Sequence, residues 1–170
     1  MRKILVVSHC IINPHSKARG LATKEKIEAS RKALYELLKD TDLGIVQLPC
    51  PEMLYAGLGR KPAPRSFYDN SDFRRICREI AEQVVKLVRE YEEEGVKIIA
   101  YIGVEGSPSC GVEWTHFEEE RAEKGMGIFT ETLLETMSNA GIRIAMLGLP
   151  ESEKYGTIGE MLEKLKLIKP

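Results

Sequence analysis

Three of the four cysteines in this chain of 170 residues lie in short segments whose composition suggests chemistry. Cys10 ends a Ser-His-Cys segment, Cys50 begins Cys-Pro-Glu, and Cys110 lies in Ser-Pro-Ser-Cys-Gly. Three thiolates suit a soft metal ion or an iron–sulfur cluster, and neighbouring thiols could also undergo oxidation chemistry. A cysteine can equally be a small buried hydrophobe, and this is the interpretation of Cys77, which falls on an apolar helical stripe.

Polar side chains next to these cysteines are candidates for catalysis or metal binding. Glu52, expected on a loop rather than a helix, could act as a general acid or base. Ser107 and Ser109, beside Cys110, could orient a substrate or a water molecule, or could satisfy the backbone of a turn. A structural zinc ion would need a fourth ligand, which a histidine could supply. The candidate histidines are His9, His15 and His116.

Basic residues and glycines offer two further, weaker signals. Positive side chains in the first two cysteine segments would stabilise thiolates or an anionic cluster, although loop lysines and arginines are commonly just solvated. The Gly125-Met126-Gly127 segment could bring backbone amides towards an anion at a helix N-terminus. The basic residues are Lys17, Arg19, Arg60, Lys61 and Arg65.

Strands and helices alternate in the pattern of the whole chain. Apolar stripes at three- and four-residue spacing predict helices, and continuous short apolar runs predict strands buried on both faces of a parallel sheet. The predicted strands are residues 3–7, 44–48, 97–102 and 143–147, and the helices lie within 27–38, 73–91, 128–139 and from Thr157, where Glu160 completes a capping-box spacing. This order predicts a single α/β domain over residues 1–170, a three-layer α/β/α sandwich with a short parallel four-stranded sheet of Rossmann-like or flavodoxin-like type.

The segments that follow the first three strands are unusually long for α/β connections. They span residues 8–21, 49–70 and 103–125. Because the carboxyl ends of parallel strands share one edge of the sheet, where ligands bind in open α/β folds, we expect the three loop cysteines to converge there.

Composition and charge exclude several function classes. With a formal net charge of −1 and interleaved acidic and basic residues, the chain lacks the basic stripe that a nucleic acid polymer requires. The apolar run of residues 4–7 is too short for a signal peptide, and no stretch predicts a membrane span. We therefore expect a cytoplasmic protein with reduced thiols and a small-molecule substrate, for which a modified base or nucleoside remains possible.

At these residues the sequence resembles the 2-thiouracil desulfurase family, over roughly residues 4–148. The family pattern has a serine–x–cysteine segment, then Cys-Pro-Glu followed by Gly-Leu and Pro-Arg, then Ser-Pro-Ser-Cys-Gly. The resemblance implies a 4Fe–4S cluster held by Cys10, Cys50 and Cys110, with one iron open to the sulfur of a thiocarbonyl substrate. It also implies that Glu52 and a serine, either Ser107 or Ser109 with Ser107 preferred, assist the replacement of C=S by C=O.

One motif departs from the family pattern. The Arg-Tyr-Asp-Gly stretch after the first cysteine is replaced by Lys17-Ala18-Arg19-Gly20. The substrate is accordingly expected to be a thiolated base, nucleoside or similar small molecule, such as a thiolated pyrimidine, rather than thiouracil in particular. The alternative is a non-catalytic metal- or sulfur-binding α/β protein that uses the same cysteines, with zinc as the alternative metal.

Overall fold

A parallel sheet forms the centre of the computed structural model, which describes residues 1–119 and 121–168. Its strands are β1 (Arg2–Val7), β2 (Gly44–Gln47), β3 (Val96–Val104) and β6 (Ala145–Leu149). They are ordered β2-β1-β3-β6, and all three pairings are parallel. The predicted four-stranded parallel sheet is confirmed.

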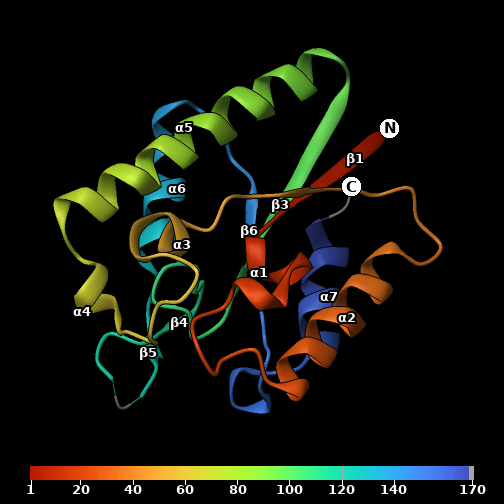
Figure 1. The fold of residues 1–170 in the computed structure, drawn as a ribbon. Helices are drawn as coiled ribbons and strands as arrows, with labels where there is room; N and C mark the ends of the chain where they lie inside the picture. The colour runs from red at the N-terminus through yellow and green to blue at the C-terminus, as the bar shows by residue number, and fades with distance from the viewer. Residues whose placement is uncertain (120, 169–170) are drawn as a thin grey trace.

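Helices cover both faces of this sheet, as Figure 1 shows. One face carries α5 (Ser71–Glu93) and α6 (Ile128–Asn139), and the other carries α2 (Lys24–Leu38) and α7 (Ile158–Ile168). Successive residues of β1 alternate between the two cores, because neighbouring side chains of a strand point to opposite faces. The three-layer α/β/α prediction is therefore confirmed. Among the described residues, no helix combines the length and the apolar character that crossing a membrane requires.

Helix termini agree closely with the sequence, whereas the last strand is displaced. Thr157 and Glu160 form the predicted capping box, with each side chain accepting the other's backbone N–H at 3.1 Å. The strand predicted at 143–147 begins at Ala145 instead. Ile142 and Ile144 are partly buried against the core beneath α5 and α6, so their apolar character reflects helix packing before the strand starts.

The strand order contains a reversal, the kind of position beside which ligands bind in open α/β sheets. The chain passes from β1 to β2 on one side and returns to β3 on the other, so the order reverses between β1 and β3, as in flavodoxin-like folds. Short elements fill the long segments after the strands (Figure 1). These are α1 (His9–Ile12), η1 (Pro14–Ser16), α3 (Pro51–Ala56), α4 (Arg65–Tyr68), β4 (Trp114–Thr115), β5 (Glu123–Lys124) and η2 (Glu153–Tyr155).

Candidate functional site

The three loop cysteines all lie at the carboxyl edge of the sheet. Cys10 is in α1 directly after β1, Cys50 is the N-cap of α3 after β2, and Cys110 lies in the loop after β3. All are free thiols, and Cys110 is close enough to both of the others to influence the pKa of each. Cys77 is fully buried in the core formed by α5 and α6, in line with its apolar interpretation.

One side of the site, here called the Cys50 side, consists of Cys50, Glu52, Arg60 and Ser109. The Arg60 guanidinium lies 3.8 Å from Cys50 Sγ, and its Nε is 3.6 Å from Glu52 Oε1. The Ser109 hydroxyl donates to Glu52 Oε2 at 2.6 Å. The side chains of Arg60 and Glu52 are only 5% and 12% exposed, so the ion pair is shielded from bulk water.

Glu52 was predicted to lie on a loop, but it lies in the first turn of α3. Pro51 occupies the first helical position, where a missing N–H costs nothing, and Cys50 Sγ accepts the N–H of Met53 at 3.4 Å as a cap. A helix of six residues is too short to leave an apolar period in the sequence, which explains the error. The helix fixes the direction in which Glu52 leaves the backbone.

The Cys50 thiol and the nearby Tyr68 hydroxyl favour their neutral forms in the metal-free protein. Burial raises the pKa of the Cys50 thiol to about 12, and Glu52 and Cys110 add to the rise while Arg60 opposes it. Burial, together with Glu52, also raises the pKa of the Tyr68 hydroxyl above its usual value. A metal bound by Cys50 would therefore have to displace the thiol proton.

The opposite side of the site, here called the Cys10 side, consists of Cys10, Lys17 and Glu151. The Lys17 ammonium lies 3.5 Å from Cys10 Sγ and 2.6 Å from Glu151 Oε1. Burial raises the pKa of the Cys10 thiol to about 11, and Lys17 offsets part of this rise. Burial would lower the pKa of Lys17, but Cys10 and Glu151 together raise it above its usual value. Sequence reasoning missed Glu151, although it follows β6 at the edge where the cysteines follow their own strands.

The loop that carries Cys110 is held by its serines. Ser107 Oγ accepts the backbone N–H groups of Ser109 and Cys110 at 3.3 and 3.0 Å, which closes a tight turn before the thiol. The Ser109 hydroxyl lies 3.6 Å from Cys110 Sγ while it donates to Glu52. Burial raises the pKa of Cys110 as well, and the hydroxyls of Ser8 and Ser109 partly offset the rise. The structure thus connects Ser109, rather than Ser107, to Glu52.

The first turn of α6 binds this loop, and the suggestion of an anion there is wrong. The N–H groups of Ile128 and Phe129 donate to the carbonyls of Pro108 and Ser109 at 3.1 and 2.9 Å. A side chain at Gly127 would collide with the Ser109 backbone, so the glycine permits this close approach. The amides that could have received an anion instead hold the Cys110 loop in place.

The remaining candidates do not gather at the thiols. His9 and His116 each use Nδ1 on a backbone carbonyl, of Leu48 at 3.0 Å and Gly106 at 2.6 Å. Arg65 pairs with Glu131 at 2.6 Å. His15, Arg19 and Lys61 are exposed. In the part of the chain that the structure describes, no three His, Cys, Asp or Glu side chains are grouped tightly enough to hold one metal ion.

The donor set fits a cluster whose ligands are thiolates. Each candidate sulfur has a donor beside it: Lys17 for Cys10, Arg60 for Cys50 and the Ser8 hydroxyl for Cys110. Such donors stabilise electron-rich sulfur and belong to the groups that tune iron–sulfur centres. A polynuclear cluster binds each thiolate through a different iron, so its ligands are more widely spaced than those of a single ion.

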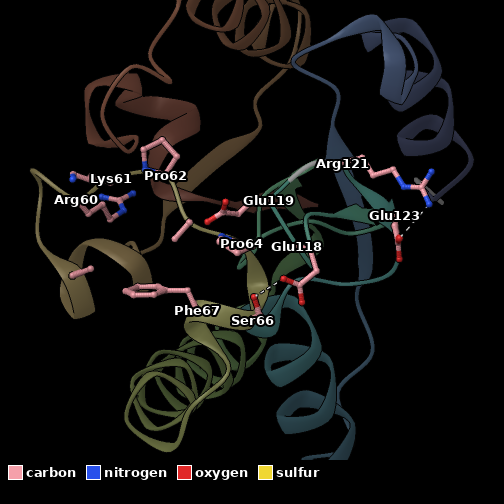
Figure 2. A pocket seen from close by; sticks show the side chains of 12 residues that line it. Arg60, Lys61, Pro62, Pro64, Ser66, Phe67, Glu118, Glu119, Arg121 and Glu123 are labelled. Atoms are coloured by element: carbon pink, nitrogen blue, oxygen red, sulfur yellow. Dashed lines mark hydrogen bonds and ion pairs between the residues drawn. The ribbon is translucent and has the colours of Figure 1, made fainter.

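An open pocket of about 1050 Å³ lies next to the Cys50 side (Figure 2). Arg60 lines it and at the same time reaches Cys50 and Glu52, so the pocket borders the site. Phe67 contributes a half-exposed aromatic ring to the pocket. Two other lining residues are joined by a hydrogen bond of 3.2 Å, which the Ser66 hydroxyl donates to Glu118. The pocket is a candidate approach route for a small molecule.

Comparisons with known proteins place the chain. Residues 2–124 match the family described as "Putative 2-thiouracil desulfurase". The uncharacterized protein MJ0003 of Methanocaldococcus jannaschii is 32% identical over 165 residues, which cover 96% of this chain and 97% of that protein. The solved structure of the [4Fe-4S]-dependent thiouracil desulfidase TudS is 19% identical, with a TM-score of 0.48 and coverage of 98% of this chain and 99% of that chain. On the match over residues 2–124, the chain belongs to the 2-thiouracil desulfurase family.

Proposed function

We propose that the protein removes sulfur from a small thiolated molecule, with a thiolated pyrimidine as the first candidate, and replaces C=S by C=O. The observation that carries the proposal is the hydrogen bond of 2.6 Å from Ser109 to Glu52, which places an acid–base pair directly beside Cys50 and Cys110. Family membership supports the same reaction class.

Cys10, Cys50 and Cys110 would hold a 4Fe–4S cluster, as the family resemblance implies. When bound, the cluster supplies Lewis-acid chemistry through an iron that has no protein ligand, which can take the sulfur of a thiocarbonyl group. Cluster binding displaces the three thiol protons, and the donors beside the sulfurs stabilise the thiolates that result. Arg60 and Lys17 would offset the negative charge that three thiolates bring into a buried site.

Glu52 acts on water in this proposal. The carboxylate accepts one proton as the water oxygen attacks the thiocarbonyl carbon, and returns it to the sulfur. It then takes the second proton from the new hydroxyl as the C–S bond breaks, and passes that proton to the departing hydrosulfide. The water oxygen becomes the carbonyl oxygen, the C=S bond breaks, and the sulfur leaves as hydrogen sulfide without a change of oxidation state. Ser109 positions Glu52 through Oε2, and Arg60 faces Oε1.

The test compares the wild type with Glu52→Gln after anaerobic reconstitution. We expect about four irons and four acid-labile sulfides per chain in both proteins, and conversion of 2-thiouracil or another thiolated pyrimidine to its oxo form by the wild type alone. Glu135→Gln, on the exposed face of α6, is the matched control and should turn over like the wild type. Zinc in place of iron, or a full cluster without turnover across thiolated bases and nucleosides, would favour a non-catalytic metal- or sulfur-binding protein.

A further inference from the structure

The proposed reaction uses the Cys50 side, gives Lys17 only a share in charge compensation and leaves Glu151 without a role. Both side chains are almost inaccessible, with 8% and 3% exposed, although charged groups are rarely buried without a partner. Lys17 has two acceptors, Glu151 Oε1 at 2.6 Å and Cys10 Sγ at 3.5 Å. The second contact joins the ion pair to a candidate cluster ligand.

The pair also connects parts of the fold that are not neighbours in the sheet. Lys17 follows η1 in the segment after β1, and Glu151 follows β6, while β3 lies between these two strands. The ion pair therefore spans the carboxyl end of β3 and fixes the ammonium beside Cys10.

The energetics of burial argue against a merely stabilising role. A buried ion pair repays its desolvation only when its remaining polar atoms are satisfied, and apolar replacements are often equally stable. Here Glu151 Oε2 has no hydrogen-bond partner within residues 1–119 and 121–168. A pair that leaves one carboxylate oxygen unsatisfied, while it directs its cation at a sulfur, is better explained by what the cation does to that sulfur.

We propose that Lys17, held in place by Glu151, is a positioning residue that sets the reduction potential of a cluster bound at Cys10. This inference rests on the proposed function only in requiring that cluster. A positive charge and an N–H donor at a ligand sulfur stabilise the reduced, more negative cluster more than the oxidised one, which makes the potential more positive. Glu151 has the opposite charge and acts against this effect.

The experiment measures the reduction potential of the reconstituted cluster anaerobically, by electron paramagnetic resonance and visible absorption. Lys17→Met should shift the potential to more negative values, and Glu151→Gln should shift it to more positive values, because the lysine charge is then uncompensated. The double variant should lie between the two single variants. Lys24→Met is the matched control and should leave the potential unchanged, since its pair with Glu28 is solvent-exposed on α2.

Opposite signs are the decisive result, since a purely structural ion pair would give shifts of the same sign or cluster loss in both variants. If Lys17→Met does not assemble a cluster, Lys17→Arg and Glu151→Gln test the inference instead. Lys17→Arg should keep a reduction potential near that of the wild type, and the potential of Glu151→Gln must still shift to more positive values. If the wild type turns over substrate and the variants have the same reduction potential as the wild type, this inference alone is overturned. Opposite shifts without turnover would overturn the proposed reaction alone, and a wild type that forms no cluster would overturn both.

Discussion

The two sides of the site contain the same kinds of group but connect them differently. On the Cys10 side, the carboxylate of Glu151 binds the Lys17 ammonium at 2.6 Å. On the Cys50 side, the Arg60 Nε is 3.6 Å from Glu52, and the shorter contact of that carboxylate, at 2.6 Å, is with the Ser109 hydroxyl.

This difference indicates a division of labour. The Glu151 carboxylate is occupied by the Lys17 ammonium and is only 3% exposed, so water and substrate have little access to it. A carboxylate that shares a hydroxyl, at a position more open to solvent, can exchange protons with water or substrate. The proposed function therefore uses Glu52 for proton transfer and Lys17 for charge compensation, although each stands beside a candidate cluster ligand.

The largest effect, on iron content, should come from replacing Cys110, whose thiol is near both Cys10 and Cys50. Cys110→Ser should reduce iron after anaerobic reconstitution from about four per chain to nearly none, because a cluster with three protein ligands loses a third of them. Cys77→Ser is the matched control: its thiol is also buried but lies on α5 rather than in a loop after a strand, and its iron content should equal that of the wild type. Equal loss in the two variants would mean that stability, rather than ligation, determines cluster content.

Ser109 and Ser107 offer the next contrast. Ser109→Ala removes the donor to Glu52 and should lower kcat by about 100-fold while the iron content stays unchanged, a loss typical of an impaired general acid or base. Ser107→Ala removes the acceptor for two backbone N–H groups and should lower the thermal midpoint and the cluster content instead. Reversed outcomes would restore Ser107, the serine that we preferred on the sequence, as the partner of Glu52.

Breaking the Arg60–Glu52 pair should have a smaller but clear effect on stability. Arg60→Leu leaves a buried carboxylate without its cation and should lower the free energy of unfolding of the metal-free protein by about 3 kcal/mol in urea. Arg75→Leu breaks a pair whose side chains are 56% and 61% exposed, and should cost less than about 0.5 kcal/mol. Similar losses in both variants would mean that Arg60 contributes packing rather than charge.

The sequence predicted the architecture well because the signals were local and periodic. Helix α6 was predicted with its observed bounds, and the capping box of α7 forms as expected. Short elements that lack an apolar period could not be predicted. The one that affects the site is α3, because Glu52 was expected on a loop and lies in this helix.

The site was predictable only in part, because its partners are distant in the chain. The position after a strand sufficed for the cysteines, and the same rule could have identified Glu151. Lys17 and Arg60 were candidates for stabilising thiolates, but nothing in the sequence separated them from the exposed Arg19 and Lys61, since burial depends on contacts that no local pattern encodes. The Lys17–Glu151 pair joins residues 134 positions apart, and only the strand order shows that both lie at one edge.

The smallest effect concerns the thiols without metal, where the two sides should behave alike. The folded pKa values of Cys10 and Cys50 are raised by burial from 9.0 to about 11 and about 12. Above pH 9 the unfolded chain therefore loses a thiol proton that the folded chain keeps, so stability is complete below pH 9 and falls as the pH rises. Each thiol should cost about 1 kcal/mol between pH 9 and pH 10.

Urea unfolding of the reduced, metal-free wild type, Cys10→Ser, Cys50→Ser and Cys77→Ser at these two pH values measures each contribution as the difference from the wild type. Cys77 lies outside both sides, and because burial also raises its pKa, Cys77→Ser should remove a similar contribution. If only Cys10→Ser left the pH dependence unaltered, Lys17 would be holding the pKa of Cys10 near its ordinary value. The Cys10 thiol would then give up its proton to incoming iron more readily than the Cys50 thiol, and Lys17 would act on cluster assembly as well as on cluster charge.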